Sequence, residues 1–119
     1  MSELNDQIKL MESTIESAKP AIDTAEALNR LMDNKDFKHV FMDGFLRNFA
    51  VDQVRMKSRP EMQHEEAQKG INASLDGVGA LWGYIDAVNA AGNHAANQTE
   101  QCLQAIYELE NTPADELEG

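Results

Sequence analysis

The chain has little of several residue types, and each scarcity excludes a class of protein. Cys102 is its one cysteine, so no intramolecular disulfide can form and a reducing compartment is expected. Aromatic residues make up 6% of the 119 residues, so a core must be built mainly from aliphatic side chains. No stretch approaches the roughly 18 apolar residues that a membrane span needs, and no apolar run follows a basic leader. We therefore expect a soluble, cytoplasmic protein.

Positive charge is scarce as well. Ten Lys and Arg residues stand against 21 Asp and Glu, which gives a formal net charge of −11. Nucleic-acid phosphates and anionic lipids would repel such a chain, so we expect no direct nucleic-acid partner and no membrane partner. With 42% hydrophobic residues the chain nevertheless has enough apolar material to fold. Its length suits one helical domain, expected over 1–112, followed by an acidic flexible tail over 113–119.

The phenylalanines form the most informative pattern, because all four recur at intervals of four residues: Phe37, Phe41, Phe45 and Phe49. On an α-helix this spacing stacks the rings along one ridge. The same neighbourhood, 34–59, holds six of the ten basic residues and is net +3, while 1–33 sum to −4 and 60–119 to −10. The pattern predicts an aromatic, basic helix between two acidic helical arms.

This central helix is expected over about 36–57. Asn34 or Asp36 can cap its start, and Asp43 and Arg47 have the spacing of a surface ion pair. Phe, Val, Leu and Met residues cover most of its circumference. A helix this apolar lies either at the centre of a bundle or in an interface.

A heptad-like seam predicts a helix in the first arm. Its apolar residues alternate intervals of four and three, and they are Leu4, Ile8, Met11, Ile15, Ala18, Ile22 and Ala25. The seam reaches Leu28 and Met32 after one slip. Pro20 removes a helical hydrogen bond, so a kink or break is expected near Lys19. The seam either covers the chain's own core or joins a copy or partner as a coiled coil.

The second arm predicts a long helix from Pro60 to about Asn111. Its seam comprises Ala67, Ile71, Leu75, Val78, Trp82, Ile85 and Val88, then Cys102, Ile106 and Leu109. This arm is either a long rod or breaks within 90–94, where glycine and asparagine occur together. Gly77, Gly79 and Gly83 are costly inside a helix, so we expect them to allow close approach of another backbone beside Trp82 and Tyr84.

Catalytic signatures are missing from this pattern. Glu61 and His64 form one E-x-x-H pair, whereas di-iron carboxylate bundles need two such pairs and two further glutamates. His39 and His94 stand alone, and Cys102 has no CxxC partner. There is no phosphate-binding glycine loop and no nucleophile elbow. We therefore expect no metal, no cofactor and no enzymatic activity.

One block of the chain, 28–88, has a recognisable combination of packing motifs. They are Leu28-Asn29-Arg30-Leu31-Met32, Asp36-Phe37-Lys38-His39-Val40-Phe41-Met42-Asp43-Gly44-Phe45, Met62-Gln63 with Glu65, and Leu75-Asp76-Gly77-Val78-Gly79-Ala80-Leu81. In these motifs the chain resembles small, mostly uncharacterised helical proteins encoded by tailed bacteriophages. The resemblance implies a phage origin alongside virion genes, and a place in the bacterial host cytoplasm or the virion. It transfers no active-site residue.

Together these patterns predict an all-α fold with a kinked N-terminal helix, a short central helix and a long C-terminal helix, arranged as an antiparallel hairpin or three-helix bundle. The leading hypothesis is a noncatalytic structural or virion-assembly protein that acts as a homo-oligomer or on other virion proteins. Its expected interface residues are Phe37, Phe41, Phe45, Phe49, Gly79, Trp82 and Gly83. The alternative is a phage effector that inhibits a host protein through its acidic surface, and a nucleic-acid-binding packaging subunit comes third.

Overall fold

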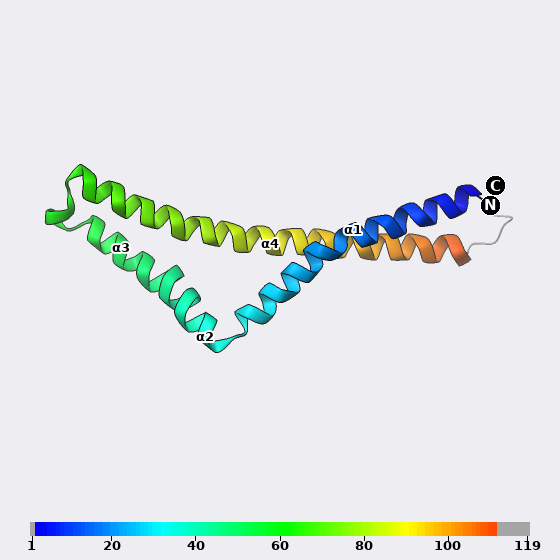
Figure 1. Cartoon of the computed structure of the whole chain (residues 1–119), viewed down its shortest axis with the longest axis horizontal. Helices are drawn as coiled ribbons and strands as arrows, with labels where there is room; N and C mark the ends of the chain where they lie inside the picture. Colours follow the sequence, from blue (N-terminus) through cyan, green and yellow to red (C-terminus); the bar gives the residue numbers. More distant parts are fainter. Residues whose placement is uncertain (1, 112–119) are drawn as a thin grey trace. The chain divides into compact units, whose positions relative to one another are not determined.

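The computed structural model describes residues 2–111, and all regular structure in that range is helical (Figure 1). The elements are α1 (Ser2–Met32), α2 (Lys35–Phe37), the π-helix η1 (Lys38–Phe49), α3 (Ala50–Lys57), the 3-10 turn η2 (Pro60–Met62) and α4 (Glu65–Asn111). The all-α fold, with a short central and a long C-terminal helix, is thereby confirmed. The acidic tail expected over 113–119 lies outside the described residues.

The chain packs as two compact units. Unit 1 combines Met1–Glu26 with Asn89–Gly119, and unit 2 is Ala27–Val88. The expectation of a single domain over 1–112 stays a prediction.

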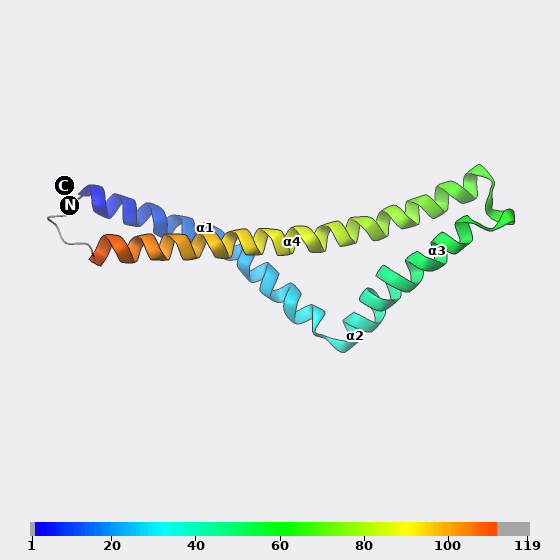
Figure 2. The same cartoon turned by 180° about the vertical axis from the view of Figure 1, so that it is seen from behind.

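Unit 1 is an antiparallel pair made by the first part of α1 and the last part of α4 (Figures 1 and 2). Ala18 of α1 and Ala95 of α4 are buried, and Ile15 and Ile22 are half-buried on the α1 seam. Gly92 of α4 is also buried. A β-carbon placed on it would collide with the methyl group of Ala25 on α1. The two helices therefore approach closely at Gly92.

Of the two alternatives left open for the second arm, the unbroken helix is the correct one, because α4 is a single helix of 47 residues, about 70 Å long, with no break within 90–94. Gly92 lies on the seam with α1. Because it has no side chain, α1 can approach α4 closely at this point. Asn93 and His94 are exposed and leave the helix undisturbed. The surrounding alanines favour the helix and offset part of the cost of glycine.

Of the kink or break expected near Lys19, the break does not occur, since α1 continues from Ser2 to Met32 with Pro20 inside it. Pro20 has no N–H to donate to the carbonyl of Glu16. Both residues are exposed, so water can donate to that carbonyl instead. The Thr24 hydroxyl donates to the Pro20 carbonyl at 2.9 Å.

In unit 2 the central helical segment begins as expected. Asn34 is its cap, because its side-chain oxygen accepts from the Phe37 backbone N–H at 2.9 Å. The expectation of a regular α-helix over 36–57 is wrong for Lys38–Phe49, which is π-helical. A π-helix is wider than an α-helix because each N–H reaches back five residues. Gly44 suits this geometry, since a β-carbon there would lie 3.2 Å from the His39 carbonyl oxygen.

The core of unit 2 joins this segment to α4. Leu46, Val78 and Ile85 are buried together. Around them pack the partly buried Leu28, Met42, Phe45, Phe49, Ala50 and Leu81. Apolar contact between η1, α3 and the first half of α4 thus defines this unit.

Side-chain amides fix the connection between α3 and α4. Gln68 Nε2 donates to the carbonyls of Lys57 (3.1 Å) and Met62 (2.8 Å), and Lys57 Nζ donates to Asn72 Oδ1 at 2.8 Å. The long helix starts at Glu65, five residues later than expected at Pro60, which instead opens η2. His64 explains the later start, because its Nδ1 accepts from the Ala67 N–H at 3.2 Å and so caps α4.

The glycines of α4 provide a test of the close approach in unit 1. Gly92→Ala should lower the free energy of unfolding by about 1–3 kcal/mol, because the new methyl group forces α1 and α4 apart at Ala25. Gly77→Ala is the matched control: nothing lies within 4 Å of its β-carbon position, so it should gain about 1 kcal/mol from helix propensity. Urea denaturation followed by circular dichroism measures both. An equal gain in the two variants would contradict the close approach.

Candidate functional site

A cleft of about 390 Å³ lies in unit 2 beside the only tryptophan of the chain. We call it the Trp82 cleft. Its lining residues come from the end of α1, from η1 and from α4, and they are Met32, Lys38, Met42, Asp43, Leu46, Arg47 and Trp82. The volume falls within the range of sites that bind small ligands or peptide side chains.

The spacing of residues on η1 builds one wall of the cleft. Lys38, Met42 and Leu46 recur at intervals of four, close to one helical turn, so they form a row along the segment. Trp82 faces this row from α4 and is 41% exposed, whereas Leu46 is buried. The cleft therefore has an apolar floor and an exposed aromatic ring at its side.

Charged groups stand at the same cleft. Arg47 Nη2 donates to Asp43 Oδ1 at 2.9 Å, which confirms the expected ion pair. The two side chains are 70% and 42% exposed, so this bond contributes at most about 0.5 kcal/mol and leaves most of the guanidinium available. Lys38 is exposed, and no carboxylate of residues 2–111 forms an ion pair with it. The cleft thus offers two cationic groups to a ligand.

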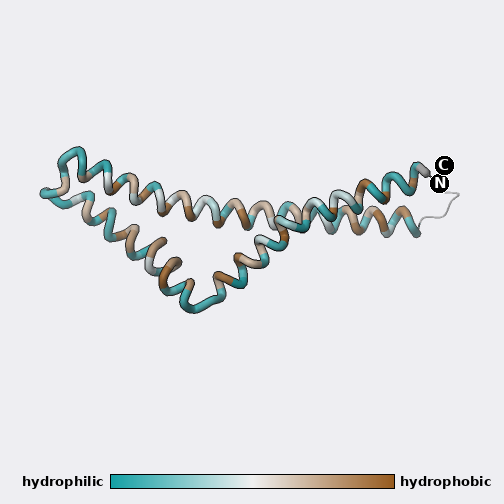
Figure 3. Tube along the Cα trace, in the orientation of Figure 1, coloured by the Kyte–Doolittle hydropathy of each residue, from teal (hydrophilic) through white to brown (hydrophobic). Residues whose placement is uncertain are grey.

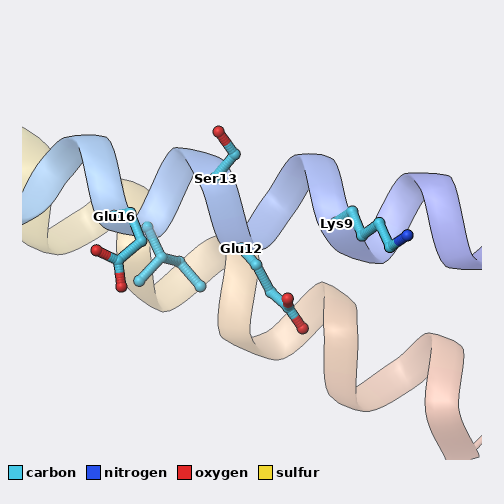
Figure 4. Close-up of a pocket in the computed structure, with 5 residues that line it drawn as sticks. Lys9, Glu12, Ser13 and Glu16 are labelled. Atoms are coloured by element: carbon cyan, nitrogen blue, oxygen red, sulfur yellow. The ribbon is translucent and has the colours of Figure 1, made fainter.

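A second hollow lies along α1 in unit 1 and has a volume of about 500 Å³. Lys9, Glu12, Ser13, Ile15 and Glu16 line it. Figure 4 shows Ser13 pointing away from Glu12 and Glu16, so its polar groups do not converge on one point. This hollow does not assemble a reactive set of side chains.

The described residues that could bind a metal or react lie apart from one another. Within residues 2–111 no three His, Cys, Asp or Glu side chains are grouped to hold a metal ion. His64 serves as the cap of α4, while His39 and His94 are exposed. Cys102 is a free, half-buried thiol on the α4 seam.

The phenylalanine ridge is divided into two stacked pairs. The ring centroids of Phe37 and Phe41 are 5.2 Å apart, and those of Phe45 and Phe49 are 5.4 Å apart. Phe45 and Phe49 pack against the buried core of unit 2, whereas Phe41 is 45% exposed. The ridge therefore supplies both core and surface.

The expected glycine interface is open. Nothing lies within 4 Å of a β-carbon built on Gly79 or Gly83, and both residues are exposed. No other backbone of the described chain uses the space that these glycines leave, so contact with another chain stays a prediction. Of the seven expected interface residues, only Trp82 lines the cleft.

Sequence reasoning missed the opposite wall of the cleft, made by Lys38, Met42 and Leu46. The available signal was their interval of four, which repeats that of the phenylalanines one position later. That signal did not indicate where α4 would place Trp82.

Figure 3 colours the chain by hydropathy. Within residues 2–111, no helix has an apolar stretch long enough to cross a membrane. Comparison with known proteins finds no matching family model, no similar curated protein and no similar solved structure. The surfaces just described therefore carry the functional argument.

Phe45 and Phe41 provide a test of which part of the phenylalanine ridge belongs to the core and which to the surface. Phe45→Ala should cost about 2–4 kcal/mol in free energy of unfolding, because Phe45 packs on the Leu46, Val78 and Ile85 core. Phe41→Ala removes an exposed ring of the same chemistry and should cost less than about 1 kcal/mol. Denaturant titration of the two variants measures the difference. Equal losses would place Phe41 in the core as well.

Proposed function

We propose that the chain is a noncatalytic assembly protein, acting through helix–helix contacts with copies of itself or with other proteins of a virion. Its working surface is the exposed face of unit 2. The resemblance to small helical proteins of tailed phages supports the virion setting, and the absence of converging reactive groups in either hollow agrees with a binding role.

The observation that carries this proposal is an open pair of glycines on α4, Gly79 and Gly83, which lie four residues apart on one side of the helix and which we call the glycine face. Each glycine costs about 1 kcal/mol relative to alanine inside a helix, and these two receive no compensating contact from the described chain. Glycine in a helix allows a second backbone to approach closely, as it does at Gly92 in unit 1. A partner helix on this face would supply the missing contact.

Exposed apolar side chains on the same unit also support a partner. They are Leu31, Val40, Phe41, Val51, Val54, Trp82 and Tyr84. Aromatic side chains such as Phe41, Trp82 and Tyr84 dominate the energetics of protein interfaces because each buries a large area with few rotatable bonds. Their exposure on the unit that also carries Gly79 and Gly83 supports the proposal that this surface is covered by a partner.

Unit 1 favours the second candidate, an effector that binds a basic surface of a host protein. Its residues include 12 Asp and Glu but only two Lys, so it carries a formal charge of −10, whereas unit 2 carries −1. Contacts made by such a surface depend on charge steering and weaken as salt screens them.

Light scattering behind size exclusion, at low and high salt, tests the proposal. We expect an oligomer that persists at high salt, because apolar helix packing is not screened. Gly83→Leu should reduce the mass to 13.2 kDa without loss of helix signal, since the new side chain fills space that the partner needs. Gly70→Leu, farther along α4 from Trp82, should affect association less. A wild-type monomer under all conditions would contradict self-assembly and favour the effector.

A further inference from the structure

The Trp82 cleft has a composition that selects its ligand. Met32, Met42, Leu46 and Trp82 supply apolar surface, and methionine adapts readily to the shape of a bound side chain. Lys38 and Arg47 supply positive charge, and Arg47 spends only one of its N–H donors on Asp43 in the observed ion pair. The complementary ligand is an apolar side chain flanked by carboxylates.

The chain itself contains such a segment twice. Glu108-Leu109-Glu110 closes α4, but Leu109 is half-buried on the α4 seam and is thereby engaged in unit 1. The second occurrence is Glu116-Leu117-Glu118, preceded by Asp115 and lying beyond the described residues. Three carboxylates around one leucine match the two cations and the apolar floor of the cleft.

The proposed self-assembly brings a second copy of the chain to this one, and each copy carries residues 115–118. The second copy is therefore the source of the segment, and dilution distinguishes it from the same residues of the chain that forms the cleft.

We infer that the Trp82 cleft binds residues 115–118 of a second copy of this chain, with Leu117 on the apolar floor and the acidic side chains against Lys38 and Arg47. This inference rests on the proposed self-assembly and names one of its contacts. The contact is heterologous, because the cleft and the acidic segment are different surfaces. Repeating it links copies in one direction, and the glycine face of α4 is a separate contact.

Trp82 makes the contact measurable, because all tryptophan fluorescence of the chain comes from the cleft. Concentrating the full-length protein should shift its emission to shorter wavelength as the ring loses water. A synthetic peptide of residues 112–119, added to dilute full-length protein, should produce the same shift while blocking head-to-tail association. The same peptide with Leu117→Ser should bind about tenfold more weakly or worse, since it lacks the apolar anchor.

Charge exchange provides the matched control. Full-length Lys38→Glu should bind the wild-type peptide about tenfold more weakly, and a peptide carrying Glu116→Lys and Glu118→Lys should recover that loss. Failure of recovery, or equal binding of the Leu117→Ser peptide, would overturn this assignment of the cleft.

Two further results separate the inference from the proposed function. If the full-length Leu117→Ser variant shows the wild-type emission shift and mass at every concentration, assembly stands and the occupant is another segment. If dilution leaves Trp82 shielded in the wild type but not in the Leu117→Ser variant, the segment binds within its own chain and the second-copy assignment is wrong. Peptide binding by a strictly monomeric protein would overturn self-assembly while retaining the ligand chemistry.

Discussion

The structure depends on one apolar stripe along α4. Ile71, Val78, Ile85 and Gly92 are all buried and follow one another at intervals of seven residues, so they lie on one face of the helix. In unit 2, Val78 and Ile85 of this stripe pack with Leu46 of η1 and Ala50 of α3. In unit 1, Gly92 lets α1 approach α4 closely. Side-chain size changes along the helix: Ile and Val in unit 2 give way to Gly92 and Ala95, and the half-buried Ile106 and Leu109 follow farther along unit 1. Large residues fill the gap between helices, and small residues let the helices close it.

In unit 2 the π-helix η1 contributes to both the core and the surface. The π-helical segment η1 contributes Leu46, Phe45 and Phe49 to the core, yet it leaves Phe41 and Val40 exposed. Because its rows of residues at intervals of four run side by side, the same segment that packs the core also forms a wall of the Trp82 cleft. Core and candidate binding surface are thus consecutive residues of one segment. Substitutions in it must be assigned by burial, as the contrast between Phe45 and Phe41 illustrates.

Local rules predicted what depends on neighbouring residues. Asn34 caps the central segment and Asp43 pairs with Arg47 because both interactions span three or four residues. The seam of α1 was predictable for the same reason. The sequence left open whether the helix breaks near Gly92, because the packing reason for that glycine lies on α1, at Ala25, and is not visible from neighbouring residues. Periodicity assigned Trp82 to the seam, whereas the structure places Leu81 against the core and exposes Trp82. The π-helix and the cap at His64 had no distinctive sequence signal beyond Gly44, and the cleft required the tertiary position of α4.

The half-buried thiol of Cys102 gives unit 1 its own reporter. Since the chain has one cysteine, any thiol-specific reagent labels a single known point on the α4 seam. The rate of labelling under native conditions rises when α1 and α4 separate, because opening of the seam exposes the half-buried thiol further. Trp82 reports on unit 2. A label on Cys102 is 20 residues away in sequence and should not perturb the Trp82 signal. Changes in the two units can therefore be followed separately in one unmutated protein.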